Sequence, residues 1–254
     1  MHVLLDGKNT VIYGGAGAIG SAVARTFARE GAPVFLAGRT QSTLDAVADE
    51  IRAAGGEAHG TALDALDERA VDEFADDVDA RAGGIDVSFN LISHGDVQGT
   101  PMAEMELEDF MRPIDTAVRS TFITARAAAR HMIPRRTGAI LIFGGSGDPV
   151  PDYSIGGFQV GLHALEAMRR QLSSELGRHG VRVVTLKTGG IPESIPAGYE
   201  GRDRIEEMLT DATMLKRTAT LEDVGNAAAV AASDMARTMT AATINVSCGA
   251  LIDP

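Results

Sequence analysis

The sequence predicts an α/β domain built on one doubly wound, parallel sheet of about seven strands, with helices on both faces. The first observation is that short apolar runs alternate with amphipathic helical patterns along the whole chain. The second is that the apolar runs are continuous, as expected for strands that are buried on both faces. The third is that 254 residues, with no linker or internal repeat, suit one domain over residues 1–254.

The elements can be placed in order along the chain. Strands are expected at 10–13, 33–37, 58–63, 85–92, 139–143, 181–186 and 242–247, and helical patterns at 19–27, 44–51, 71–78, 104–133, 155–176 and from Thr220. Glycine pairs at 55–56 and 83–84 end two of these helices, and Pro113 marks a bend or a new start in the long one. Residues 191–215 interrupt the alternation, and we expect them to form a flap over a site.

A glycine-rich turn lies between the first strand and the first helix. Its glycines fit the pattern G-x-G-x-x-G, with an apolar strand before it and a helix after it. Such glycines allow a tight turn that brings the pyrophosphate of a dinucleotide to the helix N-terminus. The alternative is a tight turn without a ligand. We expect a Rossmann-type fold with cofactor contacts from Gly14, Gly15, Ala16, Gly17, Ala18, Ile19 and Gly20.

The end of the second strand favours NADP(H) over NAD(H). An acidic residue there would bind the ribose 2′-hydroxyl of NAD, whereas this strand ends in Gly38-Arg39-Thr40. The guanidinium of Arg39 suits a 2′-phosphate, with Thr40 beside it, although Arg39 would equally be a solvated loop residue. Asp64, after the third strand, is placed either to contact the adenine or to cap a helix.

Composition excludes several classes of function. The net charge of −12 argues against a nucleic acid or an anionic membrane as partner, since both require a basic surface. Cys248 is the only cysteine, so no internal disulfide forms, and six scattered histidines give no metal-ligand spacing. The first ten residues lack a signal-peptide pattern, and no apolar run is long enough to span a membrane. We expect a cytoplasmic protein without a metal.

Several segments resemble the short-chain dehydrogenase/reductase family. The family's T-G-x-x-x-G-x-G motif is similar to residues 13–20, its N-N-A-G motif to Asn90-Leu91-Ile92-Ser93, its later P-G to Thr188-Gly189, and its last strand to residues 239–252. The resemblance covers nearly the whole chain and implies a nicotinamide cofactor, a small-molecule substrate and a homodimer or homotetramer. It also implies further cofactor contacts from Asn90, Leu91, Ile92, Gln159, Thr188, Gly189 and Ile191.

The catalytic positions depart from the family's pattern of serine, tyrosine and lysine helped by an asparagine. The resemblance places Ile155 at the tyrosine position, Gln159 at the lysine position and Ala117 at the asparagine position. The serine position falls at Gly145 or Ser146. The chain therefore resembles a divergent member that lacks the usual proton donor. Gln159 can still hydrogen-bond a ribose hydroxyl, but it carries no charge to lower a tyrosine pKa.

Tyr153 lies two residues before the expected tyrosine position. The sequence Pro151-Asp152-Tyr153 is similar to the enoyl reductase branch, whose tyrosine is further from its lysine. Tyr153 is therefore a candidate hydrogen-bond donor to a developing enolate, and the alternative is a surface-loop tyrosine. His94 follows the fourth strand on the side where substrates sit in this family, or it has no role. Lys187, before the Thr188-Gly189 turn, is expected to be solvated.

Three functions are compatible with these patterns. The one we favour is an NADP(H)-dependent oxidoreductase with a non-standard site, formed by Tyr153, Gln159 and Ser146, that reduces a C=C, C=N or C=O group. The second is a non-catalytic regulatory or partner subunit that binds the nucleotide. The third is an enzyme for elimination or isomerisation on the same scaffold, since a fold does not determine a function.

Overall fold

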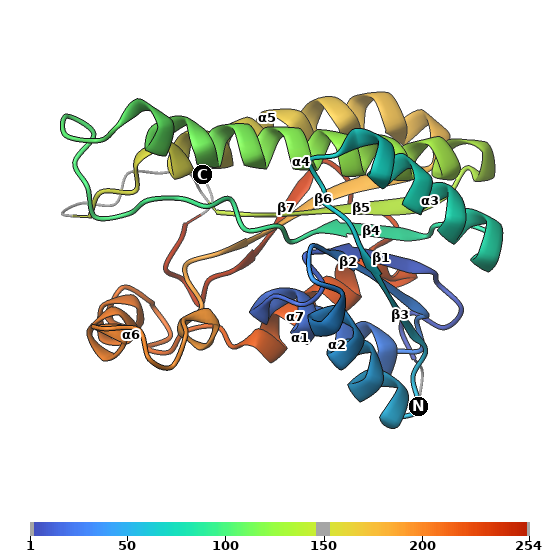
Figure 1. The fold of residues 1–254 in the computed structure, drawn as a ribbon, viewed down its shortest axis with the longest axis horizontal. Helices are drawn as coiled ribbons and strands as arrows, with labels where there is room; N and C mark the ends of the chain where they lie inside the picture. The colour runs from blue at the N-terminus through green and yellow to red at the C-terminus, as the bar shows by residue number, and fades with distance from the viewer. Residues whose placement is uncertain (1–2, 146–152, 253–254) are drawn as a thin grey trace.

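A parallel sheet forms the centre of the molecule (Figure 1). The computed structural model describes residues 3–145 and 153–252, and it shows seven strands in the order β3-β2-β1-β4-β5-β6-β7. Every neighbouring pair of strands is parallel. The strands are β1 (Thr10–Tyr13), β2 (Val34–Gly38), β3 (Ala58–Ala62), β4 (Val87–Asn90), β5 (Gly138–Gly144), β6 (Val181–Thr188) and β7 (Ala242–Val246).

Two layers of helices cover the sheet (Figure 1). The helices are α1 (Ala18–Arg29), α2 (Gln41–Ala53), α3 (Glu68–Ala82), α4 (Leu107–Arg135), α5 (Gly156–Leu176), α6 (Arg202–Asp211) and α7 (Leu221–Ala232), with short 3₁₀ turns at Gly177–His179, Pro192–Ser194 and Asp234–Ala236. Ile12 and Leu186 pack with α1, α2 and α7 on one face, and Val11 and Val183 pack with α3, α4 and α5 on the other. The predicted single-domain, doubly wound fold is therefore confirmed.

The strand order reverses between β1 and β4, and this reversal determines where a ligand can bind. β1 pairs with β2 on one side and with β4 on the other, so the connections from these strands run in opposite directions along the sheet. In open α/β sheets, ligands bind at such a switch point, outside the carboxyl ends of the strands. The glycine-rich turn after β1 and the loop after β4 both lie there.

The long helix α4 differs from its prediction. It runs without interruption from Leu107 to Arg135 and contains Pro113, so a new start at this proline is wrong. Pro113 is buried, and its carbonyl oxygen lies 3.3 Å from the position that a Cβ on Gly161 of α5 would occupy. We attribute the continuity of α4 to this close packing on α5, which opposes the local preference of proline to break a helix.

The segment predicted as a flap contains structure of its own. Residues 191–215 include the 3₁₀ turn Pro192–Ser194 and helix α6, which lies apart from the two helical layers (Figure 1). The side chain of Leu209 lies 2.9 Å from the position of a Cβ on Gly190, just after β6. The segment thus folds back toward the carboxyl end of the sheet. Among residues 3–145 and 153–252, no helix has the length and apolar character needed to cross a bilayer.

Candidate cofactor and substrate site

The glycine-rich turn after β1 fits only glycine at two of its positions. The backbone N–H groups of Gly14 and Gly15 both donate to the carbonyl oxygen of Ala37 on β2, at 2.8 and 3.1 Å. Gly14 has a φ of +76°, and a Cβ there would lie 2.5 Å from the carbonyl oxygen of Leu91. A Cβ on Gly20 would collide with the Gly14 carbonyl. The turn is therefore compact and leaves its backbone close to any ligand above it.

The N-terminus of α1 is not capped by a side chain. Its N-cap residue is Gly17, and its first turn has no acidic residue. In contrast, Asp67 caps α3 and Thr220 forms a capping box on α7. Because the first N–H groups of a helix have no partners within it, α1 presents donors and a partial positive charge to an anion. Ala16, Ala18 and Ile19, for which we predict cofactor contacts, lie at this end.

Arg39 and Thr40 lie between β2 and α2 and are both exposed. Within residues 3–145 and 153–252, no hydrogen bond or ion pair engages the Arg39 guanidinium, and Thr40 is the N-cap of α2 without a side-chain cap bond. Asp64 is also exposed, and its carboxylate accepts the N–H of Leu66 at 3.0 Å. Asp64 does not cap a helix, because that role on α3 belongs to Asp67.

Asn90 joins the end of β4 to α4. Its side-chain amide donates to the hydroxyls of Ser120 and Thr121 at 3.0 and 3.1 Å, and its Oδ1 accepts the N–H of Ile92 at 3.1 Å. The N–H of Leu91 donates to the carbonyl oxygen of Tyr13 at 2.9 Å. Since the Asn90 side chain is used internally, residues 90–92 would meet a cofactor through their backbone.

Tyr153 lies where the segment before α5 is hydrogen-bonded to the loop after β4. Its hydroxyl donates to Oε1 of Gln98 at 3.0 Å, and the N–H of Gly99 donates to the carbonyl oxygen of Ser154 at 2.7 Å. Burial, together with Tyr199 of the predicted flap and Asp96, raises the pKa of Tyr153. A raised pKa keeps the hydroxyl protonated at neutral pH, so Tyr153 is a hydrogen-bond donor but not an activated acid.

His94 is the other polar group of the loop after β4. Its ring packs on Phe158 of α5 with the centroids 5.7 Å apart, and its Nδ1 is buried with no hydrogen-bond partner among residues 3–145 and 153–252. Burial lowers the pKa of His94, and the nearby charge of Asp96 opposes this shift only in part. The imidazole is therefore neutral at pH 7. A buried polar atom without a partner is uncommon in native proteins.

The remaining predicted residues lie at the carboxyl ends of β5 and β6 or just beyond them. Gln159 is half-buried in the first turn of α5, and Thr188 ends β6. A Cβ on Gly189 would lie 2.7 Å from Cβ of Ala250, in the loop after β7, and Ile191 is buried. Ser146 lies outside the described residues.

The predicted solvent exposure of Lys187 is wrong. Its exposed fraction is only 6%, so it is buried at the end of β6 rather than solvated. The apolar run of β6 could have indicated this, because Lys187 continues the row of alternate residues that begins with Val181 and Val183.

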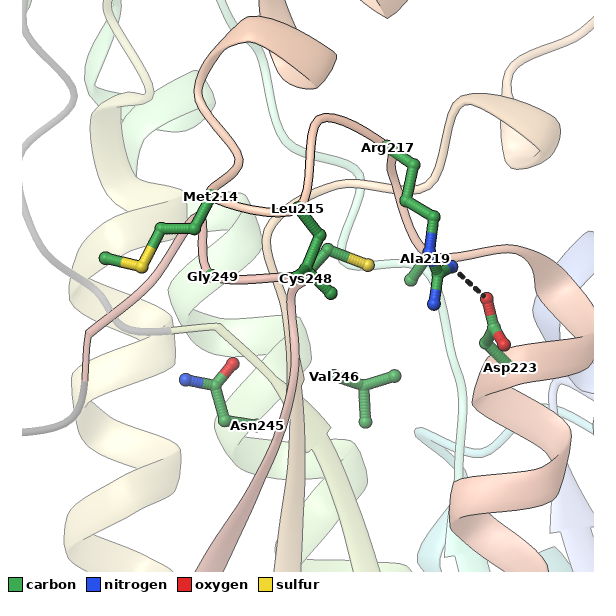
Figure 2. Close-up of a pocket in the computed structure, with 9 residues that line it drawn as sticks. All are labelled: Met214, Leu215, Arg217, Ala219, Asp223, Asn245, Val246, Cys248 and Gly249. Atoms are coloured by element: carbon green, nitrogen blue, oxygen red, sulfur yellow. Dashed lines mark hydrogen bonds and ion pairs between the residues drawn. The ribbon is translucent and has the colours of Figure 1, made fainter.

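A separate cavity of about 510 Å³ lies beside the loop after β7 (Figure 2). The predicted flap ends here, and the N–H of Leu215 donates to the carbonyl oxygen of Cys248 at 3.1 Å. Arg217 and Asp223 form an ion pair at its edge, with 3.2 Å between Nη1 and Oδ2. None of the predicted cofactor residues lines this cavity, but Met214 and Leu215 of the predicted flap do. It is lined by Met214, Leu215, Arg217, Ala219, Asp223, Asn245, Val246, Cys248 and Gly249.

Known proteins are similar to the chain over nearly its whole length. A family model described as enoyl-(acyl carrier protein) reductase matches residues 14–250. The chain belongs to the short-chain dehydrogenase/reductase family. Among relatives in the family, momilactone A synthase of Oryza sativa subsp. japonica is 32% identical over 254 residues, covering 96% of this chain and 90% of its own. Secoisolariciresinol dehydrogenase of Forsythia intermedia is 30% identical over 239 residues, covering 92% and 85%.

A solved structure of this family has the same architecture. A 7α-hydroxysteroid dehydrogenase complexed with NADH and 7-oxo glycochenodeoxycholic acid gives a TM-score of 0.87 at 26% identity, covering 98% of this chain and 96% of its own. Short-chain dehydrogenases/reductases bind nicotinamide cofactors and act on small molecules, and this chain is an oxidoreductase of that type. The compact glycine turn and the uncapped start of α1 fit such a dinucleotide.

Proposed function

We propose that this protein is an NADP(H)-dependent oxidoreductase that reduces a C=C, C=N or C=O group of a small molecule. The observation that carries the proposal is the turn after β1, where glycine packing and an uncapped helix N-terminus leave donors for a pyrophosphate. The exposed Arg39, at the end of β2, supports NADP(H). When bound, the reduced nicotinamide supplies a hydride. The chain's own residues bind and orient the two reactants and exclude water.

Replacing Arg39 with methionine tests the cofactor preference. We expect the dissociation constant for NADPH to rise about tenfold, because a charge-assisted hydrogen bond to phosphate contributes about 1.5–3 kcal/mol and Arg39 is exposed. The dissociation constant for NADH serves as the internal control and should not change. Fluorescence titration with both nucleotides measures the effect. An equal loss for both would contradict the 2′-phosphate role, and no saturation of the wild type with either would contradict the proposed function.

The proposed active site is non-standard, with Tyr153, Gln159 and Ser146 as its candidate residues. Tyr153 has the geometry of a donor, since its hydroxyl already gives a hydrogen bond to Gln98 in the loop after β4. Gln159 would hold a ribose hydroxyl. The flap at 191–215 would close over the substrate, which is compatible with the contact of Leu209 on Gly190.

For an activity found among activated alkenes, imines or ketones, Tyr153→Phe should lower kcat by about 100-fold with little change in NADPH affinity. Phenylalanine keeps the ring and removes only the donor. Gln171→Leu, which removes an exposed polar side chain of α5 that bonds Glu175, is the control and should retain most of the activity. Steady-state rates together with NADPH titration measure both effects. An unchanged kcat in Tyr153→Phe would exclude it as the donor.

The raised pKa of Tyr153 favours one alternative, a non-catalytic subunit that binds the nucleotide. An unactivated tyrosine is a poor acid, and the family's lysine position holds a neutral glutamine. This alternative predicts saturable NADPH binding with no oxidation of NADPH by any activated alkene, imine or ketone.

We also propose a cytoplasmic homodimer or homotetramer that associates through α4 and α5. Leu107, Met111 and Phe122 of α4 are 73%, 44% and 50% exposed, and Val160 of α5 is 43% exposed. Apolar side chains gathered on neighbouring helices are typical of subunit interfaces. Light scattering should give a mass of two or four chains, and Phe122→Glu should lower that mass. A monomeric wild type would contradict the proposal.

A further inference from the structure

The cavity beside the loop after β7 lies between the end of the predicted flap and the end of the sheet (Figure 2). Met214 and Leu215, the last residues of the flap, form one part of its wall. Val246 of β7 and Cys248 and Gly249 of the following loop form another part. Its volume of about 510 Å³ lies within the range of about 300–1,000 Å³ that is typical of small-molecule sites. The occupant that this volume suits is therefore a small molecule.

The wall of the cavity is mostly apolar, and part of it is exposed. Met214 and Leu215 are 65% and 62% exposed, whereas Ala219 of the same wall is 2% exposed. Covering apolar surface contributes about 25 cal/mol for each Å² removed from water, and a methionine side chain adapts its shape to a ligand. Two adjacent, exposed apolar side chains that line a cavity therefore favour an apolar ligand.

The two charged residues that line the cavity neutralise each other. Nη1 of Arg217 lies 3.2 Å from Oδ2 of Asp223, and the same oxygen accepts the N–H of Thr220 at 3.0 Å. The hydrogen bonds from Thr220 and the charge of Arg217 lower the pKa of Asp223, so its carboxylate is ionised at neutral pH. Among the lining residues that the structure describes, no other carries a charge. A charged ligand would have to compete with this ion pair, whereas an uncharged ligand would leave it intact.

The end of the flap is held to the loop after β7 at this cavity. The N–H of Leu215 donates to the carbonyl oxygen of Cys248 at 3.1 Å, and a Cβ on Gly249 would lie 2.7 Å from Cβ of Met214. A molecule in the cavity would contact the flap end and this loop at the same time. Since a ligand shifts an equilibrium toward the state that it binds better, its binding would favour the position in which the flap end lies on the loop.

We propose that the cavity binds an uncharged, largely apolar effector that holds the end of the flap against the loop after β7. This effector is a further ligand beside the proposed nicotinamide cofactor and substrate. Its effect on turnover rests on the proposed function, in which the flap closes over the substrate, because a flap that is held in place slows product release. Binding of the effector itself does not depend on that function and can be measured without a known substrate.

Three probes with one ring system test the site on the full-length protein. They are 1-naphthol, which is uncharged at pH 7, 1-naphthoate and protonated 1-naphthylmethylamine. We expect saturable binding of 1-naphthol that is about tenfold tighter than binding of either charged probe. Cys248 is the only cysteine in the chain and lines the cavity, so 1-naphthol should slow the alkylation of its thiol by iodoacetamide. Equal binding of the three probes, or alkylation that stays equally fast at saturation, would overturn the proposal.

Two exposed methionines give a matched pair of variants. Met214 lines the cavity and is 65% exposed, whereas Met235, in the 3₁₀ turn after α7, is 72% exposed and does not line it. Met214→Gln should raise the dissociation constant of 1-naphthol about tenfold, because the apolar contact is lost, and Met235→Gln should leave it unchanged. Both variants should bind NADPH as the wild type does. An unchanged 1-naphthol dissociation constant in Met214→Gln would overturn the site.

Limited digestion with trypsin measures the effect on the flap. Arg204 lies in α6 within the flap and is exposed, and Arg237 is exposed outside the flap. We expect saturating 1-naphthol to slow cleavage after Arg204 several-fold and to leave cleavage after Arg237 unchanged. Bound 1-naphthol that leaves cleavage after Arg204 unchanged would overturn its role in holding the flap.

Kinetics test the effect on turnover for any substrate that is reduced. Saturating 1-naphthol should lower kcat, and a high concentration of substrate should not restore the rate. Inhibition that the substrate removes by competition would place the probe at the substrate site and overturn the effector role. Absence of NADPH binding by the wild type would instead overturn the proposed function, while the probe titrations and the alkylation of Cys248 would still decide the site.

Discussion

Replacing Arg169 with methionine is expected to lower the free energy of unfolding by about 3–5 kcal/mol. Arg169 lies on α5 with its side chain 6% exposed, and its Nη2 is 2.8 Å from Oε2 of Glu166, whose side chain is 17% exposed. Nε of Arg169 donates to the same oxygen at 3.1 Å. Removing the guanidinium would leave the Glu166 carboxylate in a buried position, with only the hydroxyls of Thr185 and of Thr243, 3.2 Å away, beside it among the described residues.

A matched control variant, which removes an exposed arginine, separates the effect of burial from the effect of losing a charge. Arg119 and Asp115 form an ion pair on α4 with 3.4 Å between Nη1 and Oδ2, but their side chains are 60% and 56% exposed. Arg119→Met should therefore cost less than about 1 kcal/mol. The double variant Glu166→Leu with Arg169→Met should recover most of the stability, because a buried pair replaced by apolar side chains leaves no charge behind. Urea unfolding of the four proteins measures these differences, and equal costs for Arg119→Met and Arg169→Met would contradict the account.

The loss of unfolding free energy caused by Arg169→Met should depend on pH. In the wild type, burial opposes the ionisation of Glu166, but the hydrogen bonds and charge of Arg169 and the hydroxyl of Thr243 lower its pKa overall. A carboxyl with a lowered folded pKa stabilises the fold above its unfolded pKa of about 4.3, and this contribution is lost as the pH falls through the folded value. Without Arg169, burial alone raises the pKa, so the variant loses stability as the pH rises. The difference in unfolding free energy between the wild type and Arg169→Met should be largest at pH 7 and should shrink near pH 4.

The fold could be predicted from the sequence because its signals are local. The continuous apolar runs of β2 and β5 identify strands buried on both faces, and the glycines between β1 and α1 identify a tight turn. Pro113 was harder to interpret, because its local preference to break a helix is opposed by packing of α4 on Gly161 of α5. No short window of sequence contains that contact.

The site was less predictable because its residues meet across long sequence distances. Tyr153 is bonded to Gln98 and is influenced by Tyr199, so its environment depends on three loops whose positions only the fold provides. The same is true of Lys187. Its position beside a turn suggests that it is solvated, but it is buried on the sheet face where Val181 and Val183 pack with the helices. The cofactor preference and the roles of Tyr153, Gln159 and Ser146 stay predictions.

Replacing Gly20 with alanine is expected to weaken NADPH binding by about 100-fold and to destabilise the fold by about 1–3 kcal/mol. The added methyl would collide with the Gly14 carbonyl and lie 3.1 Å from Cα of Gly15. The turn cannot move aside freely, since Gly14 and Gly15 are both bonded to Ala37 and the Gly14 carbonyl accepts the N–H of Gly17 at 3.0 Å. Any movement of the turn away from the added methyl would displace the N–H groups that we expect to hold the pyrophosphate.

Gly177→Ala is the matched control for this substitution. Gly177 has helical dihedral angles, with a φ of −58° and a ψ of −38°, and a Cβ there meets nothing within 4 Å. Alanine should be neutral or slightly stabilising at this position, because it reduces the freedom of the unfolded chain. NADPH titration and urea unfolding of both variants separate the two effects. If Gly20→Ala loses stability but binds NADPH as tightly as the wild type, the turn after β1 is a structural feature alone and the dinucleotide lies elsewhere.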